Sequence, residues 1–280
     1  MIDLSIIITN INNKKILIGC LDSIFKNTHK LSLEVIVSDN GSADGTQEMI
    51  KSNFPQVVLI ENKENLGFAK ANNKGLKIAK GKYLCLLNND TIVYGPAFST
   101  MVNFMENSPK EIGCCAPTLL NVDGTYQHQG GLFQKKFWLS KTPIKISFAI
   151  GACLLFRREA LEKIGYLDEN LFFYNDDLDY CIRIKKAGYK IYFVPDAKIM
   201  HYGGYSTKKT FNRKIFVEGF RGGLYFTKKH YGNLAYHLYR FILATGILIF
   251  LPLLILSYPF KRESYIDRVL AYVDILRVSI

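Results

Sequence analysis

One group of polar residues suited to binding a cation follows an apolar run. Asn88, Asn89 and Asp90 come directly after residues 83–87, with no glycine or proline to turn the chain. A carboxylate oxygen suits a hard divalent cation such as Mg²⁺ or Mn²⁺, and neighbouring amides supply neutral oxygens or hydrogen bonds. The same three residues are also typical of a simple polar turn.

A second group of carboxylates suits proton transfer. Asp176 and Asp177 follow the aromatic-rich residues 171–174. Mutual repulsion and partial desolvation would both raise a carboxyl pKa toward the range useful for a general base. The structural alternative is that both acids simply begin a helix, where the helix dipole stabilises negative charge. Asp179 and Arg183, four residues apart, would then pair on the surface of that helix.

Two further polar residues stand at the ends of apolar runs. Asp39 opens the turn Asp39-Asn40-Gly41-Ser42, which by itself is typical of a turn with a helix cap. His201 precedes Gly203 and Gly204, and it is interpreted either as a metal ligand or as a structural histidine.

The elements that must position these residues alternate along the first part of the chain. Buried-strand patterns and helical periodicity succeed one another, which predicts an α/β fold with a mainly parallel central sheet flanked by helices. Ligands of such sheets bind at the carboxyl ends of the strands, where the residues after Leu87 would lie. The predicted strands are 4–8, 33–37, 57–60 and 83–87, and the predicted helices are 14–27, one starting near Asp44, and 66–79.

The alternation becomes less regular after about residue 117. Residues 121–134 are rich in turn formers. The patterns then predict a strand at 148–156, helices at 158–164 and 177–186, a strand at 190–194 and a loop at 195–204.

Composition narrows the class of protein. The 280 residues are 49% hydrophobic, and 36 Lys and Arg against 24 Asp and Glu give a net charge of +12. This charge suits nucleic acid, an anionic membrane or a phosphorylated substrate. Six cysteines without a CxxC pair indicate reduced core thiols in a cytosolic compartment. The start MIDLSIII lacks the features of a signal peptide, so we expect the bulk of the chain to stay in the cytoplasm.

A long apolar segment lies near the other end. Residues 241–260 carry no charge, and twenty helical residues cover about 30 Å, roughly a hydrocarbon core. Pro252 would kink or break a spanning helix there. Beyond it, apolar residues between Ile266 and Leu276 recur at helical spacing, which predicts an amphipathic helix along a membrane surface. A buried core helix is the alternative.

Seven motifs of the sequence occur in the order in which a known family of enzymes has them. They are SIIITNIN, EVIVSDNGSADGT, ENLGFAKANNKG, YLCLLNNDT, IGACLLFRREALEKIG, YLDENLFFYNDDLDYCIRIKKAGYKI and VPDAKIMHYGG. Over roughly residues 3–232 the chain resembles the inverting family-2 glycosyltransferases of the GT-A fold, especially the rhamnosyltransferase-like members that build bacterial surface polysaccharides.

The resemblance implies a role for each matching residue. Thr9 and Asp39 would line the nucleotide pocket, and Asn65, Lys70 and Asn73 would lie along the nucleotide or diphosphate. Asn88, Asn89 and Asp90 stand where the family has its DxD motif, and His201 would join Asp90 in binding Mg²⁺ or Mn²⁺. Gly151 and Ala152 would shape the acceptor side of the cleft. Asp177 would be the catalytic base, with Asp176 beside it.

Two residues differ from the family's motifs, and one motif of related enzymes is missing from the sequence. Asn88 replaces the first acid of DxD, and Asp176 replaces the glutamate of the usual Glu-Asp pair. The QxxRW motif of processive synthases is absent from the sequence, since its one tryptophan is Trp138, so one sugar is expected per binding event.

The resemblance also implies partners and a location. A nucleotide-binding half at about residues 1–117 and an acceptor half at about 118–232 would precede membrane-associating helices at 233–280. The donor would be a dTDP- or UDP-linked sugar, the acceptor a glycan or polyprenyl-linked glycan, and the site of action an anionic membrane surface on the cytoplasmic face of the bacterial inner membrane.

Three other classes of protein fit the sequence less well. A nucleic-acid-binding protein would explain the charge, but no recognition motif is present and acids occupy the strand ends, so no nucleic-acid partner is expected. A nucleotidyltransferase should carry a glycine-rich basic loop where this chain has TNINNKK. A non-catalytic membrane scaffold would not need Asp90, Asp177 and His201 together.

Overall fold

The structure is a computed structural model that describes residues 2–129, 136–172, 174–203, 211–256 and 265–279. The chain forms two compact units. The sheet unit comprises Met1–Asp168 and Asp176–Gly203, and the helical unit comprises Glu169–Asn175 and Gly204–Ile280. This division by contacts falls near residue 203, and the end of the transferase domain expected at residue 232 stays a prediction.

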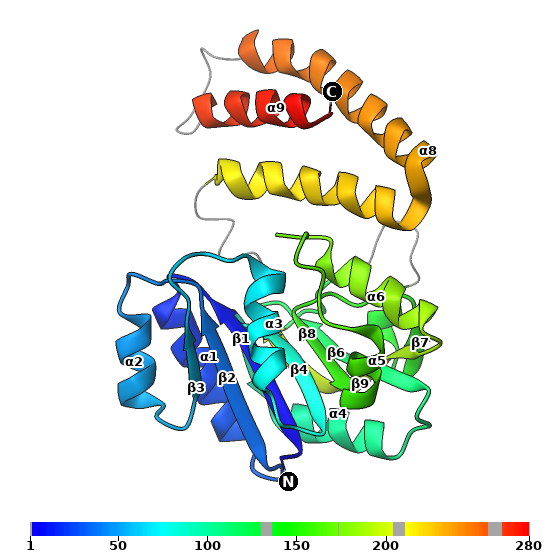
Figure 1. Cartoon of the computed structure of the whole chain (residues 1–280). Coiled ribbons are helices and arrows are strands. Elements are labelled where there is room, and N and C mark those ends of the chain that lie inside the picture. The colour runs from blue at the N-terminus through cyan, green and yellow to red at the C-terminus, as the bar shows by residue number, and fades with distance from the viewer. Residues whose placement is uncertain (1, 130–135, 173, 204–210, 257–264, 280) are drawn as a thin grey trace. The chain divides into compact units, whose positions relative to one another are not determined.

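The sheet unit alternates strands and helices along the chain (Figure 1). Its elements are β1 (Leu4–Asn10), α1 (Lys14–Asn27), β2 (Leu33–Asp39), α2 (Thr46–Asn53), β3 (Val58–Glu61), α3 (Phe68–Ile78), β4 (Tyr83–Asn88), β5 (Thr91–Tyr94), α4 (Ala97–Glu106), β6 (Ile112–Leu120), the 3₁₀ turn η1 (Phe137–Leu139), β7 (Ile144–Ile146), β8 (Cys153–Arg157), α5 (Arg158–Ile164), α6 (Asp176–Lys186) and β9 (Lys190–His201).

One sheet joins the strands in the order β3-β2-β1-β4-β8-β6-β9-β5, with β7 paired to β9. The first four strands are parallel, whereas β8 runs antiparallel to β4 and β5 runs antiparallel to β9. Thr9 lies opposite both Ser38 and Asn88, so β1, β2 and β4 end together at one edge. The predicted mainly parallel α/β architecture is confirmed, and its polar strand ends meet where ligands of such sheets bind.

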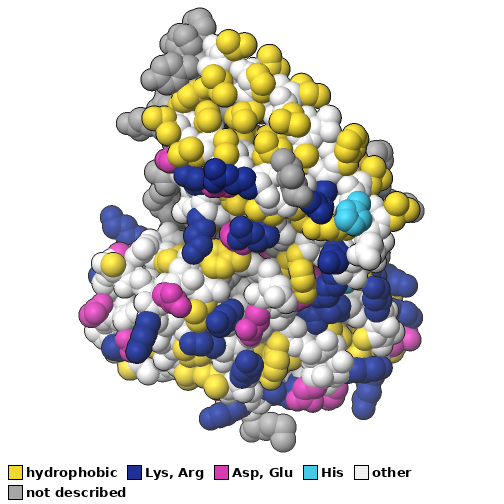
Figure 2. Space-filling view, turned by 45° about the horizontal axis from the view of Figure 1, so that its top comes forward, with side chains coloured by type: hydrophobic (Ala, Val, Ile, Leu, Met, Phe, Trp, Pro, Cys, Tyr) yellow, Lys and Arg dark blue, Asp and Glu magenta, His cyan; other side chains and the backbone are white. Residues whose placement is uncertain are grey.

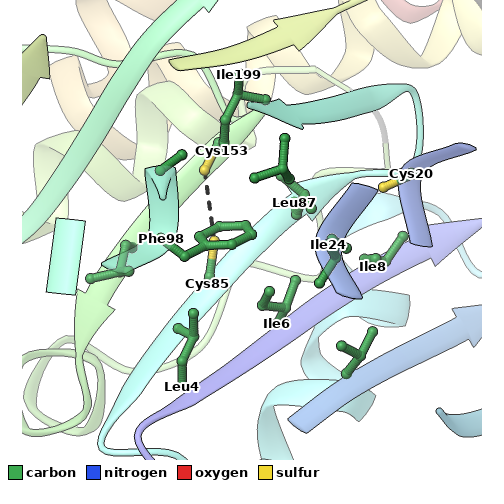
Figure 3. Packing of buried hydrophobic residues seen from close by; sticks show 14 of the residues in the cluster. Leu4, Ile6, Ile8, Cys20, Ile24, Cys85, Leu87, Phe98, Cys153 and Ile199 are labelled. Atoms are coloured by element: carbon green, nitrogen blue, oxygen red, sulfur yellow. Dashed lines mark hydrogen bonds between the residues drawn. The ribbon is translucent and has the colours of Figure 1, made fainter. Parts of the chain in front are cut away.

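Apolar side chains fill both faces of the sheet, because the side chains of a strand alternate between its faces. Ile6 and Ile8 pack on one face with residues of α1, α2 and α4 (Figure 3). Ile7 points to the other face, where α3, α5 and α6 contribute. Helix α3 approaches closely at Gly75, where an added Cβ would lie 2.6 Å from Ile7 Cγ2.

Strand β9 corrects the expectation of a loop at residues 195–204. The strand continues from Lys190 to His201. Its pairing with β6 shifts between Pro117 and Thr118, because Pro117 lies opposite Val194 but Thr118 lies opposite Lys198. Residues 195–197 therefore form a bulge, which Thr118 Oγ1 fastens by donating to the Pro195 carbonyl at 2.9 Å. Pro195 is compatible with this strand, because proline is tolerated at a bulge.

Other boundaries were predicted with mixed success. The helices at 14–27 and 158–164 are confirmed, and β6 was not predicted. The strand expected at 148–156 is shorter and covers Cys153–Arg157, since residues 148–150 have no regular secondary structure and residues 151–152 form a turn. Six free, buried cysteines bear out the expectation of core thiols.

The helical unit contains α8 (Arg213–Leu256) and α9 (Tyr265–Ser279). Pro252 lies within α8, but the non-helical backbone is at Gly232, whose φ of 83° and ψ of −176° divide α8 into two helical segments. We call these the basic segment (213–231) and the apolar segment (233–256). The stretch expected to be a membrane segment ends at residue 260, and residues 257–260 lie outside the described residues.

Candidate active site

The Asn88-Asn89-Asp90 motif ends β4 and leads directly into β5. No glycine or proline is needed, because the chain continues as another strand of the same sheet. Asn88 N donates to the Ala152 carbonyl at 2.9 Å, and the Asn88 carbonyl accepts from Thr91 Oγ1 at 2.8 Å. Asn89 Nδ2 donates to Asn10 Oδ1 at 2.7 Å. The motif is thus held by backbone and amide contacts on both sides.

Asp90 and His201 lie side by side although they are far apart in the sequence. The pairing of β5 with β9 places Thr91 opposite His201, and the distance from His201 Nε2 to Asp90 Oδ1 is 3.3 Å. Both residues are less than a tenth exposed. The other ring nitrogen, Nδ1, lies 2.8 Å from Gln127 Oε1.

The orientation of Gln127 fixes which ring nitrogen of His201 carries hydrogen. Gln127 Nε2 donates to Asn121 Oδ1 at 3.3 Å and to the His201 carbonyl at 3.4 Å, so Oε1 faces the ring and Nδ1–H donates to it. In the neutral ring, Nε2 therefore turns a lone pair toward the carboxylate of Asp90, and Asn88 Nδ2 lies 3.4 Å from the same nitrogen.

A divalent cation fits this donor set. A carboxylate oxygen and an imidazole lone pair that face each other repel unless a positive charge joins them. Among the described residues no group of three His, Cys, Asp or Glu side chains could hold a metal. The protein would therefore supply Asp90 and His201, and a substrate diphosphate and water would complete the shell, as is usual for Mg²⁺.

Asp39 is completely buried at the end of β2 and is saturated with hydrogen bonds. Oδ1 accepts from Asn10 Nδ2 at 3.1 Å and Ser42 Oγ at 2.5 Å, and Oδ2 accepts from Ser42 N at 2.9 Å and Gln47 Nε2 at 2.8 Å. Nearby on β1, Thr9 Oγ1 is buried and has no hydrogen-bond partner among the described residues. Asp39 thus shapes the strand ends, and Thr9 retains an unused polar atom there.

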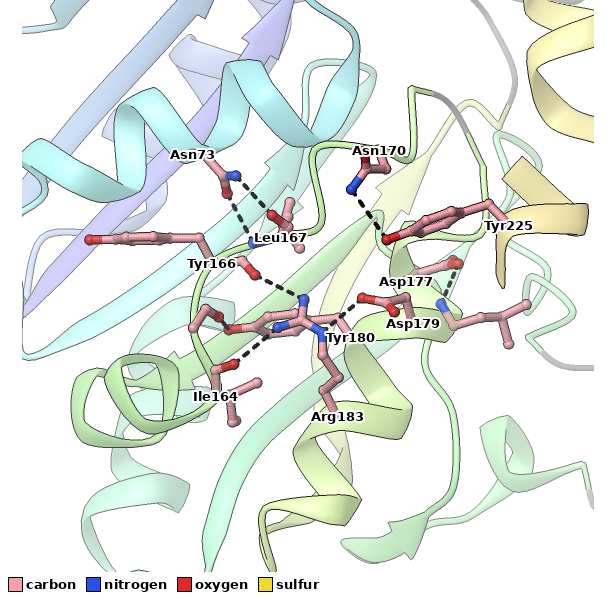
Figure 4. A network of polar contacts seen from close by, with 12 residues as sticks. Asn73, Ile164, Tyr166, Leu167, Asn170, Asp177, Asp179, Tyr180, Arg183 and Tyr225 are labelled. Atoms are coloured by element: carbon pink, nitrogen blue, oxygen red, sulfur yellow. Dashed lines mark hydrogen bonds and ion pairs between the residues drawn. The ribbon is translucent and has the colours of Figure 1, made fainter. Parts of the chain in front are cut away.

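Three residues predicted to contact the nucleotide lie on or before α3. Lys70 is an exposed cation on α3, and Asn65 Oδ1 accepts from Asn40 Nδ2 at 3.2 Å and Gly67 N at 2.9 Å. Asn73 is buried, and its amide binds both the Leu167 carbonyl (2.9 Å) and the Leu167 N–H (3.0 Å) (Figure 4). Asn73 therefore holds the chain before α6, and its nucleotide contact stays a prediction.

Asp176 and Asp177 begin α6. Burial, followed by the neighbouring charge of Asp177, raises the pKa of Asp176 to about 7. Burial also raises the pKa of Asp177, but two backbone donors oppose this effect: Gly151 N lies 3.2 Å from Oδ2 and Leu178 N lies 2.8 Å from Oδ1. Because hydrogen bonds favour the ionised form, the charge shared by the pair near neutrality resides on Asp177.

Gly151 and Ala152 connect the two groups of carboxylates. The Gly151 N–H donates to Asp177, and the Ala152 carbonyl accepts from Asn88 N. A Cβ on Gly151 would lie 3.4 Å from Asp177 Cβ and 3.9 Å from Asp176 Oδ2. Glycine therefore keeps the space beside both carboxyls open.

The pairing of Asp179 with Arg183 is present, but Asp179 is fully buried, so the expectation of a surface pair is corrected. Arg183 Nε lies 2.8 Å from Asp179 Oδ2, and its other nitrogens donate to the carbonyls of Ile164 and Tyr166 (Figure 4). A guanidinium that is held by a buried carboxylate can still donate its other N–H groups to backbone carbonyls of a second chain segment. The pair thereby fixes the segment before α6 against that helix.

Two polar residues of this site were missed by sequence reasoning. Asn10 joins Asp39 of β2 to Asn89 of the motif, and Gln127 orients His201. Asn10 could have been found, because it ends the first strand directly after Thr9. Gln127 gave no signal beyond its place in a turn-rich segment.

Comparison with solved structures identifies the class of this fold. The structure of GalNAc-T7 with UDP, GalNAc and Mn²⁺ matches with a TM-score of 0.61 at 20% identity, covering 81% of this chain and 50% of that one. S. aureus TarS matches with a TM-score of 0.58 at 17% identity, covering 81% and 40%. At these identities the likeness shows the fold alone, which is the GT-A fold expected from the motifs.

The sequence then identifies the family. Residues 5–165, more than half of the chain, match Glycosyl transferase family 2, and the chain belongs to this family.

Its relatives include rhamnosyltransferases. The N-acetylglucosaminyl-diphospho-decaprenol L-rhamnosyltransferase of Mycobacterium tuberculosis is 26% identical over 212 residues, covering 62% of this chain and 68% of that protein. A dTDP-rhamnosyl transferase of Shigella flexneri is 25% identical, covering 60% and 59%. The UDP-Glc:alpha-D-GlcNAc-diphosphoundecaprenol beta-1,3-glucosyltransferase of Escherichia coli is 35% identical over 103 residues, covering 36% and 41%.

Proposed function

We propose that this family-2 enzyme transfers one sugar, with inversion, from a nucleoside-diphosphate donor to a hydroxyl of a lipid-linked glycan. Asp177 is the base, and Asp90 with His201 holds a divalent cation. The names of the relatives support a diphospho-polyprenol acceptor and make dTDP-rhamnose the first donor to test. The cytoplasmic face of the inner membrane, where nucleotide sugars are available, is the proposed location.

The observation that carries the proposal is the Gly151-Ala152 dipeptide. Its N–H binds the carboxyl of Asp177, and its carbonyl binds the start of the Asn88–Asp90 motif. A candidate base and a candidate diphosphate site thus share one short piece of backbone. Sugar transfer requires the two to be near each other, because the attacking hydroxyl and the leaving diphosphate must both reach one anomeric carbon.

The chain's own residues supply the proton chemistry. Each carboxyl oxygen of Asp177 accepts one backbone hydrogen bond and retains a second lone pair for the acceptor hydroxyl. As the hydroxyl oxygen bonds to the anomeric carbon, its proton passes to Asp177. The bond from that carbon to the diphosphate breaks on the opposite side, which inverts the configuration.

Asp90 and His201 act on the departing group. When bound there, a divalent cation stabilises the negative charge that develops on the diphosphate. Gln127 keeps the Nε2 lone pair of His201 directed at that position, and Asn88 contributes its amide. Without a bound cation, the carboxylate of Asp90 would repel the diphosphate.

The decisive experiment is a donor and metal panel with purified protein. Transfer from dTDP-rhamnose and UDP-sugars to a short diphospho-polyprenol GlcNAc acceptor is measured with Mg²⁺, with Mn²⁺ and in excess chelator. We expect one donor to be used, one product of inverted configuration, and loss of activity in chelator. Full activity in chelator would exclude the metal role, and a retained configuration would exclude Asp177 as a simple base.

A further inference from the structure

The apolar surface of the helical unit indicates how this protein meets a membrane. Within the described residues, one helical stretch, Arg213–Leu253, is long and apolar enough to cross a bilayer, and almost none of its most apolar part is buried. Figure 2 shows hydrophobic side chains gathered over this unit. Side chains of the apolar segment that are more than half exposed are Leu234, Leu238, Phe241, Ile242, Leu248, Ile249, Leu253 and Leu256.

Helix α9 lies along the apolar segment and runs in the opposite direction. Near its start, the Tyr265 hydroxyl donates to the Ile255 carbonyl at 3.2 Å. Near its end, the Ser279 carbonyl accepts from Arg240 Nε at 3.1 Å. Between these contacts, Ile247 packs with residues of α9 in one buried cluster. The apolar segment and α9 therefore form a helical hairpin.

The charges of α9 oppose a hairpin that crosses the bilayer. Asp267, Arg268 and Arg277 are exposed, and Asp274 pairs with Arg213 of the basic segment at 2.6 Å. If the apolar segment crossed the hydrocarbon core, α9 would carry these charges into it, where ionised side chains are strongly disfavoured. If the hairpin lies in the plane of the interface, the same charges remain among the head groups while the apolar side chains enter the acyl region.

The joint between the two segments of α8 carries the side chains of a membrane interface. Lys228 Nζ lies 5.4 Å from the ring centre of Tyr236, and the Arg240 guanidinium lies 5.4 Å from the same ring. Lys229 Nζ lies 6.0 Å from the ring centre of Tyr225. Aromatic rings with cations are typical of the head-group level, and lysines there attract anionic lipids.

We propose that the helical unit is an interfacial anchor: the hairpin of the apolar segment and α9 lies in one leaflet of an anionic bilayer without crossing it. This inference rests on the proposed action at a membrane and decides how that membrane is bound. An enzyme held in one leaflet approaches a lipid-linked acceptor from the side on which the nucleotide sugar is dissolved.

The test measures the depth of single tryptophans in vesicles. Trp138→Phe gives a background without tryptophan, into which Ile242→Trp, Leu248→Trp or Leu253→Trp is introduced in the full chain. Lipids brominated near the head group or near the chain end quench each variant in phosphatidylglycerol-containing vesicles. An interfacial hairpin predicts similar, shallow quenching at all three positions. A gradient with Leu248→Trp deepest would mean a crossing helix and would overturn the proposal.

A second measurement tests the charge of the surface. Lys228→Gln with Lys229→Gln should weaken binding to anionic vesicles by about fivefold per lysine. Lys30→Gln with Lys110→Gln, two exposed lysines of the sheet unit, should leave binding unchanged. The proposal would be overturned if the two double substitutions had equal effects on vesicle binding, or if the wild type did not bind vesicles. Transfer to a short, water-soluble acceptor, measured in parallel, separates that result from a failure of the proposed transferase activity.

Discussion

The two units of this protein use apolar residues in opposite ways. In the sheet unit, Ile6, Ile7 and Ile8 are fully buried, and polar groups concentrate at the strand ends. In the helical unit, Leu234 is 86% exposed and Leu256 76% exposed. The first arrangement keeps apolar side chains away from water, as the hydrophobic effect favours. The second is the arrangement expected of a surface that contacts lipid. Substitutions of the same kind should therefore have opposite consequences in the two units.

The largest expected difference comes from one substitution made in both units. Ile7→Glu places a charge in the core and should lower the free energy of unfolding by more than about 4 kcal/mol. Ile249→Glu, at a site 65% exposed, should change that free energy by less than about 0.5 kcal/mol but weaken vesicle binding roughly tenfold or more. Denaturant unfolding followed by Trp138 fluorescence and vesicle sedimentation measure the two effects. An Ile249→Glu protein with unaltered vesicle binding would remove the contrast.

Loss of the proposed base, Asp177, should affect the transfer reaction and leave membrane binding unchanged. Asp177→Asn should lower the turnover rate by about 10²–10⁴-fold, because the acceptor proton then has no strong base. Donor binding and vesicle binding should stay as in the wild type. Asp196→Asn, which alters an exposed acid of the same unit, is the matched control and should retain full activity. Substantial turnover by Asp177→Asn would assign the base to another group.

The affinity for a metal ion should fall when Gln127 is replaced, as well as when Asp90 is replaced. Asp90→Ala should abolish Mn²⁺ binding measured by electron paramagnetic resonance, since it removes one of the two proposed side-chain ligands. Gln127→Ala should weaken binding by about 10–100-fold, because His201 loses the partner that fixes its tautomer. Gln127→Glu, which keeps the acceptor oxygen, should restore most of the affinity. An unchanged Mn²⁺ affinity in Gln127→Ala would mean that Gln127 has only a structural role.

The smallest effect concerns pH. Because burial raises the pKa of Asp177, turnover should rise with pH as this carboxyl loses its proton. Asp176, whose pKa is raised to about 7, still holds its proton at that point, so Asp176→Asn should leave the acid limb of the pH profile in place and remove any further change in turnover near pH 7.

The raised pKa of Asp176 also makes the free energy of unfolding depend on pH. A carboxyl whose folded pKa exceeds its unfolded value loses stabilisation as pH rises between the two values. Asp176→Asn should thus stabilise the fold at pH 8 more than at pH 4, and denaturant unfolding at both pH values measures this. A larger gain at pH 4 would contradict the raised pKa.

Sequence reasoning predicted the parallel half of the sheet well, because β1, β2 and β4 are short apolar runs between clear turn formers. It missed β6, and it ended β9 at Val194, since a bulge that is stabilised by a neighbouring strand has no local pattern. The nearness of Asp90 and His201 followed from the order of the family's motifs. The hydrogen bond from Nδ1 of His201 to Gln127 depends on tertiary pairing, which one sequence does not reveal.

The bulge at residues 195–197 imposes a constraint on chain length. Successive strand residues point to opposite faces, so a deletion that shifted residues 198–201 by one position against β5 and β6 would turn His201 away from Asp90 and present a neighbour instead. The length of the bulge thus sets which side chain of β9 faces Asp90. Such a register shift would remove the imidazole from this place without any substitution of the histidine itself.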